Sequence, residues 1–320
     1  MNYWIKAAHG NETHVTIFHI LGFSGSPLLE LLFFLLCLTV YTLTLLGNSL
    51  IVFLTLSNPA LQTPMYFFLR NLSFLELCYS SVTMPRILTS YVTGNNKISF
   101  TGCAVQMSFF LLMGCAECYI LGVMAYDRYV AVCRPLRYMA MMDKRSCMLL
   151  VAGSWMSGLP VSSVQTTLTF SSPFCGPNEI NHFFCDIPPV LNLVCADTSQ
   201  IKMAMLIITV VIIIAPFTLI LISYAHIIAA VVRMSSSESR QKAISTCSSH
   251  LLVVTLFYGS AMTVYLLPQS SDSSGNDKVL SLFYTMVTPM VNPIIYSFRN
   301  KEVKAALWRT VGFPLLSQET

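Results

Sequence analysis

Long apolar runs, separated by short polar segments, make up most of this chain. Each run is close to the roughly 20 apolar residues that a helix needs to cross the hydrocarbon core of a bilayer. The pattern predicts membrane helices at residues 28–56, 64–91, 102–133, 146–168, 199–232, 243–268 and 278–298. The signal at 146–168 is the weakest, because serine and threonine are frequent there and Pro160 interrupts the run. Such a proline is tolerated where neighbouring groups satisfy the freed carbonyl.

These runs predict an all-α membrane protein, a seven-transmembrane helix bundle with an extracellular N-terminus. Residues 1–27 would form an extracellular segment, 28–298 the bundle, and 299–320 a cytoplasmic tail. The stretch NKEVKAALW after Arg299 predicts a short amphipathic helix that lies against membrane lipid. No cleavable signal peptide is evident, so we expect the first span to direct its own insertion.

Composition supports a membrane protein and argues against other classes. Of the 320 residues, 55% are apolar and 10% are charged, whereas soluble domains carry about 25% charged residues. A transporter or a channel is the first alternative, but no internal repeat is evident. The chain has no H-E-x-x-H or G-x-S-x-G motif. We therefore expect no enzyme, no cofactor and no nucleic-acid partner.

Lysine and arginine are divided unequally between the two predicted faces. One face has five, which are Lys6, Arg86, Lys97, Lys202 and Lys278. The other has thirteen, which are Arg70, Arg128, Arg134, Arg137, Lys144, Arg145, Arg233, Arg240, Lys242, Arg299, Lys301, Lys304 and Arg309. The positive-inside rule places the second group in the cytoplasm and the amino terminus outside. The sequon that begins at Asn11 agrees, because a glycan is attached on the outer side.

The eleven cysteines divide in the same way. Seven lie in spans or at cytoplasmic ends, where burial as small apolar residues is the default interpretation. Cys103, Cys175, Cys185 and Cys195 face the oxidising side, and four cysteines allow three pairings. A bond from the loop after the fourth span to the third span would hold that loop as a lid over the bundle.

Charges cluster at the cytoplasmic end of the third span. Arg134 and Arg137 fit membrane anchoring, because basic side chains at helix ends reach the interface. The adjacent Asp127 and Arg128 fit it poorly, since one charge of each sign adds no net positive charge. We interpret Arg128 as half of a latch that keeps the cytoplasmic face closed until it is released.

Motifs in other spans fit such a latch. The seventh span contains PMVNPIIYSFRN at 289–300, the fifth has Pro216 eight residues before Tyr224, and the first contains Gly47 and Asn48. Together with Asp-Arg-Tyr and seven spans, this set resembles the rhodopsin-like G-protein-coupled receptors over essentially the whole chain. The residues that we assign to G-protein coupling and switching are Asp127, Arg128, Tyr129, Tyr224, Lys242, His250, Asn292, Pro293 and Tyr296.

Longer stretches are similar to the olfactory (odorant) receptors, of the tetrapod-type class. They are PMYFFLRNLSFLELC at 64–78, MAYDRYVAVCRPLRY at 124–138, HFFCD at 182–186, SY at 223–224, KAISTCSSH at 242–250 and the 289–300 motif. The resemblance implies the disulfides Cys103–Cys185 and Cys175–Cys195. It also implies a volatile odorant as ligand, a heterotrimeric stimulatory olfactory-type G protein as partner, cyclic AMP signalling, and the plasma membrane of sensory cilia as location.

A ligand pocket is expected between the outer halves of the third, fifth, sixth and seventh spans. Periodicity alone favours ordinary helix packing, and the resemblance reverses that preference for the outer turns. The residues predicted to bind ligand are Phe110, Leu111, Gly114, Cys115, Ile208, Thr209, Ile212, Tyr258, Ala261, Met262, Tyr265 and Thr285. No acidic residue lies between Met107 and Ala116, so we expect a neutral, mostly apolar ligand.

Two further groups of residues leave alternatives open. Glu76 and Glu117 could form a hydrogen-bonded pair with one protonated carboxyl, or could hold a sodium ion in the middle of the bundle. Cys115, Cys118 and Met113 could bind copper, but side chains of this kind more often simply pack. We therefore predict no metal site from the cysteines.

Overall fold

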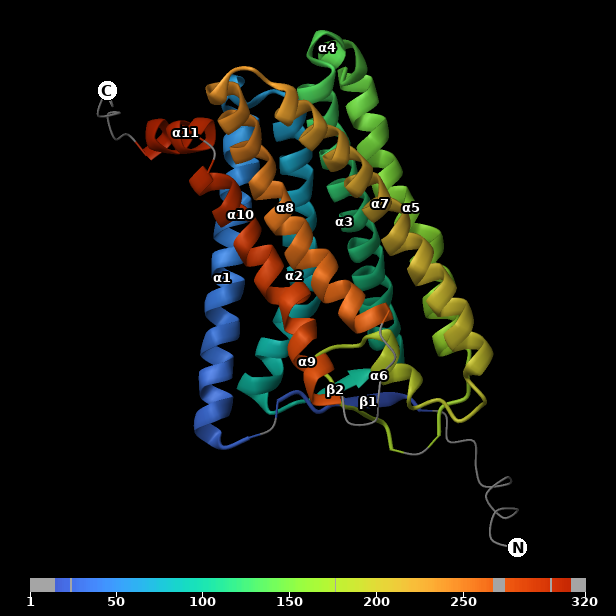
Figure 1. The fold of residues 1–320 in the computed structure, drawn as a ribbon. Coiled ribbons are helices and arrows are strands. Elements are labelled where there is room, and N and C mark those ends of the chain that lie inside the picture. The colour runs from blue at the N-terminus through green and yellow to red at the C-terminus, as the bar shows by residue number, and fades with distance from the viewer. Residues whose placement is uncertain (1–14, 24, 176, 267–273, 300, 312–320) are drawn as a thin grey trace, which may run out of the picture.

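The computed structural model describes residues 15–23, 25–175, 177–266, 274–299 and 301–311. Figure 1 shows a bundle of long helices that run side by side, with short strands at one end and a crosswise helix at the other. The long helices are α1 (Pro27–Ser57), α2 (Pro64–Thr93), α3 (Phe100–Cys133), α5 (Lys144–Phe170), α7 (Ser199–Arg233) and α8 (Ser237–Leu266). The last long segment consists of α9 (Ser274–Leu282), the π-helical η4 (Phe283–Val287) and α10 (Thr288–Arg299).

Shorter elements join these helices and cover their ends. The turns η2 (Pro59–Leu61) and η3 (Pro135–Arg137) and the helix α4 (Tyr138–Met141) lie in connections. The strands β1 (Ile17–Ile20), β2 (Lys97–Ser99) and β3 (Glu179–Ile180) and the helix α6 (Ile187–Leu191) form what we call the strand end. The helix α11 (Lys301–Val311) marks the opposite end, which we call the α11 end.

Six segments of the described chain are long and apolar enough to cross a membrane. They are Pro27–Ser57, Phe100–Cys133, Lys144–Phe170, Ser199–Arg233, Ser237–Leu266 and Lys278–Tyr296. The predicted helical bundle is confirmed in this form. The remaining predicted span coincides with α2, whose 30 residues would extend about 45 Å. This helix is less apolar because it contains polar residues, of which Ser73, Glu76, Ser80 and Thr83 are buried. It contacts both α1 and α3.

Side-chain caps fix where three of the long helices begin. The Ser26 hydroxyl accepts a hydrogen bond from a backbone N–H in the first turn of α1, and Ser99 does the same for α3. At α5, Asp143 accepts one from the Ser146 N–H at 2.9 Å. The hydrogen bonds from Ser146 lower the pKa of the Asp143 carboxyl below its usual value. Each cap satisfies a donor that would otherwise lack an intrahelical partner.

Small residues bring helices close together at defined points. A Cβ atom added at Gly47 would lie 2.9 Å from the Pro293 ring, so α1 and α10 touch there. At Gly158 an added Cβ would lie 2.7 Å from the Leu112 carbonyl oxygen, so the backbones of α3 and α5 are in direct contact. Close approach through small residues is characteristic of membrane bundles, where dispersion contacts replace the hydrophobic effect between helices.

A small sheet and an aromatic cluster close the strand end. The strand order is β2-β1-β3, with β1 antiparallel to β2 and parallel to β3. Phe18 of β1 is fully buried and packs against Phe100, Phe170 and Phe174. The amino-terminal strand thereby ties α3, α5 and the loop after α5 together.

Two disulfides hold the loop between α5 and α7. Cys103 is bonded to Cys185, with Cα atoms 5.5 Å apart, and Cys175 is bonded to Cys195, with Cα atoms 5.7 Å apart. These are the pairings that the resemblance implies. The first bond fixes the loop residues next to Cys185 over the first turn of α3, which places them at the strand end of the bundle.

The crosswise helix α11 is attached to the bundle by both apolar and polar contacts. Val303 and Ala306 are buried, and the Tyr66 hydroxyl donates a hydrogen bond to the Glu302 carboxylate at 2.7 Å. Trp308 is exposed. A helix is therefore present where the sequence predicts one, and its location on a lipid surface stays a prediction. The glycosylation site predicted at Asn11 lies outside the described residues.

Substitution at Gly158 tests the contact between α3 and α5. We expect Gly158→Ala to lower the stability of the purified protein by about 1–3 kcal/mol, because the added methyl group meets backbone that cannot move aside. Gly153→Ala on the same helix is the matched control, since nothing lies within 4 Å of its added Cβ. Thermal unfolding in detergent measures both variants, and equal melting temperatures would contradict the close packing.

Candidate ligand cavity and switch residues

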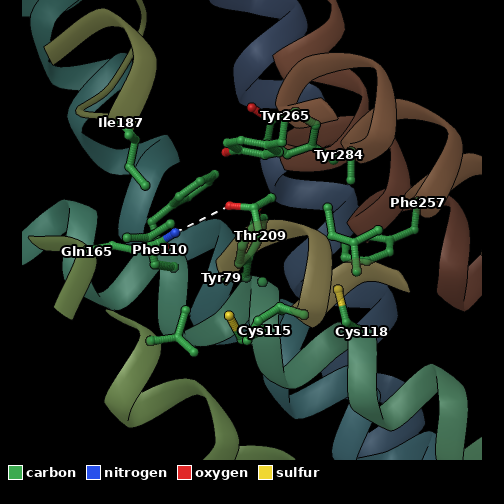
Figure 2. Close-up of a pocket in the computed structure, with 16 residues that line it drawn as sticks. Tyr79, Phe110, Cys115, Cys118, Gln165, Ile187, Thr209, Phe257, Tyr265 and Tyr284 are labelled. Carbon is green, nitrogen blue, oxygen red and sulfur yellow. Dashed lines mark hydrogen bonds between the residues drawn. The ribbon is translucent and has the colours of Figure 1, made fainter. Parts of the chain in front are cut away.

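A cavity lies in the half of the bundle nearer the strand end. It contains about 590 Å³ of space not occupied by atoms, a figure that includes the open solvent at its mouth. Side chains from α2, α3, α5, α7, α8 and η4 form its walls, and α6 contributes from the loop (Figure 2). The lining residues are Tyr79, Phe110, Leu111, Gly114, Cys115, Cys118, Val161, Gln165, Ile187, Thr209, Ile212, Ile213, Phe257, Ala261, Tyr265 and Tyr284.

Eight of the twelve residues predicted to bind ligand line this cavity. They are Phe110, Leu111, Gly114, Cys115, Thr209, Ile212, Ala261 and Tyr265. The structure places the other four, Ile208, Tyr258, Met262 and Thr285, outside the lining. On α8 the cavity is lined by Phe257 together with the predicted Ala261 and Tyr265, whereas Tyr258 and Met262 lie off it.

The π-helical η4 explains why Thr285 lies off the cavity. A π-helical turn contains an extra residue and changes the direction of the side chains that follow it. Tyr284 faces the cavity here, whereas the buried Thr285 donates its hydroxyl to the Ser281 carbonyl of its own helix at 2.6 Å. A regular helical repeat read from the sequence does not contain this shift.

The sequence prediction missed the walls formed by α2, α5 and the loop. Val161 and Gln165 lie on α5, Tyr79 lies on α2, and Ile187 begins α6. These elements were not among the four spans expected to form the pocket. The bond implied between Cys103 and Cys185 was an available signal for Ile187, because it places the residues after Cys185 over the bundle.

The roof of the cavity contains a buried acidic residue. Asp186 accepts hydrogen bonds from the Ile187 N–H at 2.8 Å, from the Tyr265 hydroxyl at 2.9 and 3.0 Å, and from the Tyr284 hydroxyl at 3.3 Å. Burial raises the pKa of the Asp186 carboxyl to about 6, although these three donors favour the ionised form. The two tyrosines therefore connect the loop to α8 and η4.

The rest of the lining is mostly apolar and contains no lysine, arginine, histidine, aspartate or glutamate. Its polar contact is the hydrogen bond from the Gln165 amide nitrogen to the Thr209 hydroxyl at 3.3 Å (Figure 2). Cys115 and Cys118 also face the cavity. Within the described part of the chain, no group of three or more His, Cys, Asp or Glu side chains is arranged to hold a metal ion.

Deeper in the bundle, Glu76 and Glu117 are both fully buried. The Asn292 side-chain amide donates a hydrogen bond to Glu76. Outside the glutamate pair itself, the other carboxyl oxygen of Glu76 and both oxygens of Glu117 have no partner among the described residues. Both interpretations of the pair stay open, because a proton shared between two of these oxygens and a bound sodium ion would each stabilise the pair.

At the α11 end, Asp127 and Arg128 have different partners. The Tyr138 hydroxyl of α4 donates a hydrogen bond to Asp127 at 2.9 Å. Arg128 is buried, and its Nη1 approaches the Met65 sulfur of α2 at 3.9 Å. Its Nε has no hydrogen-bond partner among the described residues. Arg128 therefore lies among the helix ends near Met65 and Tyr296, and its role as a latch stays a prediction.

Tyr224 and His250 connect three helices near Arg128. His250 is fully buried on α8, and its Nε2 lies 3.1 Å from the Leu121 carbonyl of α3. A carbonyl only accepts, so Nε2 holds the proton. Nδ1 must then accept the bond from the Tyr224 hydroxyl of α7 at 2.9 Å. The neutral imidazole thus bridges α3, α7 and α8.

The remaining predicted switch residues occupy separate places. Tyr129 packs beside His226 of α7, with ring centroids 5.5 Å apart. Pro293 touches Gly47, Asn292 bonds Glu76, and Tyr296 is buried on α10. Lys242 belongs to α8, and its side chain lies outside the described part of the structure.

Comparison with known proteins places the whole chain in one group. A family model described as olfactory receptor matches residues 36–312. The chain is 53% identical over 308 residues to human olfactory receptor 10A7, covering 96% of this chain and 98% of that protein. It is 55% identical over 310 residues to human olfactory receptor 10A4, with coverage of 97% and 98%. Human olfactory receptor 10C1 is 51% identical over 301 residues, covering 94% and 96%.

The roof predicts a pH dependence of stability. The folded pKa of Asp186, about 6, is raised from 3.8, so its stabilising contribution is complete below 3.8 and is lost as the pH rises through 6. Burial lowers the pKa of the neighbouring His182 to about 4, and its contribution is lost as the pH falls from 6.5 through 4. The two effects oppose each other between those limits.

Comparing wild type with Asp186→Asn isolates the aspartate, since His182 is present in both. We expect the stability of wild type relative to the variant to increase by on the order of 1 kcal/mol from about pH 7.5 to about pH 5. Melting temperatures of the purified protein in detergent provide the measurement. A difference that stays constant across this range would show that Asp186 ionises normally.

Proposed function

The chain belongs to the olfactory receptor family, and from this premise we propose that it binds a volatile odorant in the cavity and activates a stimulatory olfactory-type G protein. The family is one of G-protein-coupled receptors and not of enzymes. The observation that carries the proposal is the cavity itself, which has mainly apolar walls and a roof held by the Cys103–Cys185 disulfide. Cyclic AMP would be the second messenger.

The proposed topology has seven spans, with α2 as the span that the apolarity of the helices alone does not identify. The strand end would lie outside the cell, because disulfides form in an oxidising environment. The α11 end would lie in the cytoplasm, where most of the lysine and arginine residues are found. We place this multi-pass protein in the plasma membrane, in sensory cilia, with α11 against lipid.

The cavity favours a small neutral ligand. Burial of apolar surface contributes roughly 25 cal/mol per Å², and much of it is offset by the loss of motion on binding. Modest affinity should follow. The carboxyl of Asp186 is already bonded to Tyr265 and Tyr284, which leaves it a poor partner for a ligand cation.

Activation would proceed by a shift of population toward the form that binds odorant better. Phe257 and Cys118 both line the cavity, and Tyr258 connects their helices through a hydrogen bond to the Cys118 carbonyl at 2.9 Å. Further along, His250 connects the same two helices. A ligand that moves α8 would strain both bonds and open the α11 end beside Arg128.

A cyclic AMP reporter screen over volatile compounds tests this function. We expect Arg128→Ala to abolish the odorant response while surface expression is retained, because the variant lacks the guanidinium that we assign to the latch. Arg145→Ala, an exposed basic residue at the same end, is the matched control and should respond as wild type does. Odorant-evoked ion flux without a G protein would instead favour a channel.

Tyr265 tests whether the cavity is the odorant site. We expect Tyr265→Ala to raise the half-maximal odorant concentration roughly tenfold, because a ring contact and two hydrogen bonds to the roof are lost. Met262→Ala, on the same helix but off the cavity, should have little effect. Dose-response curves at matched surface expression measure both variants, and the reverse order would place the site on the other face of α8.

A further inference from the structure

One polar pair in the cavity wall is incompletely hydrogen-bonded. Gln165 of α5 is only 2% exposed, yet it lines the cavity. Its amide nitrogen donates to the Thr209 hydroxyl of α7 at 3.3 Å. The structure gives the Gln165 side chain no other bond with the described residues. The amide oxygen, which can accept two hydrogen bonds, therefore has no partner among the described residues.

Thr209 differs from most hydroxyl residues of these helices. Thr169 of α5 and Thr218 of α7 each donate to the carbonyl four residues earlier, at 2.9 and 2.7 Å. The Thr209 hydroxyl accepts from Gln165 and makes no such donation within the described chain. Its proton is available to a ligand. Exchanging the oxygen and nitrogen of the Gln165 amide would still leave one donor and one acceptor group of the pair available.

The other polar groups of the lining are committed or weak. The hydroxyls of Tyr265 and Tyr284 donate to Asp186 in the roof. The thiols of Cys115 and Cys118 are weak hydrogen-bonding groups. Figure 2 shows the hydrogen bond between Gln165 and Thr209 in the cavity wall. The pair is thus the strongest polar contact that the wall offers to a ligand.

We propose that the ligand is a neutral alcohol whose hydroxyl is held between Gln165 and Thr209. The ligand hydroxyl would donate to the Gln165 amide oxygen and accept from the Thr209 hydroxyl. Its hydrocarbon part would lie against Phe110, Phe257 and Ile213. An ether or a ketone can only accept, so on binding it would cover the amide oxygen without giving it a donor, which is unfavourable. This inference rests on the proposed function, because it assumes that the cavity is the ligand site.

The test compares isomers on the purified full-length receptor. The probes are unbranched primary alcohols of six to ten carbons, each paired with its isomeric methyl ether, and thermal stabilisation in detergent reports binding. We expect at least one ether to require about tenfold more ligand than its alcohol for half-maximal stabilisation. Binding measured in this way does not depend on any G protein.

Four variants identify the wall responsible. Gln165→Leu and Thr209→Val should remove the preference for the alcohol, whereas Thr209→Ser should retain it. Thr218→Val is the matched control, because Thr218 is exposed on the same helix and bonds its own backbone. Melting temperatures without ligand establish that each variant is folded, and the conservative Thr209→Ser provides a readout if either of the first two is not.

Two results would overturn the inference. One is that no alcohol of the series stabilises the protein more than its ether, and the other is that the preference survives in Gln165→Leu and Thr209→Val.

Cyclic AMP assays with the same probes separate the two proposals. Selective alcohol binding without any cyclic AMP response would support the site and contradict the proposed signalling. Responses to other ligand classes with no preference for alcohols would contradict the site and support the signalling.

Discussion

The structure depends on one constraint, which is that hydrocarbon offers no hydrogen-bond partner to a polar group. Most helical hydroxyls meet it locally. Thr44 and Thr55 of α1, for example, donate to carbonyls of their own helix. Few polar groups remain to connect different helices, and several of those that do are buried. Asn48 reaches the Pro289 carbonyl at 3.0 Å and so ties α1 to α10. Because such bonds are few, each one has a large effect on how the helices are arranged.

Three of the cross-helix bonds form a series along α3 and α8. The series begins at the cavity, where Tyr258 bonds the Cys118 carbonyl, and continues with His250 at the Leu121 carbonyl. It ends at Tyr224, on the helix that also supplies Thr209 to the cavity. A proposed ligand site and a proposed switch are thus joined by groups that cannot find other partners in lipid. Through Tyr258 and His250, α8 makes two specific hydrogen bonds to α3. A movement of α8 would have to break these bonds, whereas a uniformly apolar surface would let the helix slide.

The positions of the helices could be predicted from the sequence because apolar run length depends on bilayer thickness. The run at 199–232 matches Ser199–Arg233, and the run at 64–91 matches Pro64–Thr93. The sixth helix begins earlier than predicted, at Ser237 instead of residue 243, because its first turns are polar. The helix α2 is less apolar than the other long helices, because it contains several polar side chains that are buried between helices. Its composition alone therefore identifies it less well as a span than its place between the neighbouring runs does.

The lining of the cavity was harder to predict, for a physical reason that α8 illustrates. Periodicity identifies an apolar face only when the opposite face is polar, and in this bundle α8 is apolar in several directions. Phe257 and Tyr258 are both buried, so the sequence offers no means of choosing between them. The helical periodicity of the sequence did not identify Gln165 as a cavity residue, because a single amide among serines and threonines cannot be told from other polar residues of the span. What identifies it is its place in the cavity wall within hydrogen-bonding distance of Thr209, which is a property of the folded chain alone. Where the walls are almost uniformly apolar, shape limits the size of a ligand, and in our proposal one incompletely bonded pair determines its chemistry.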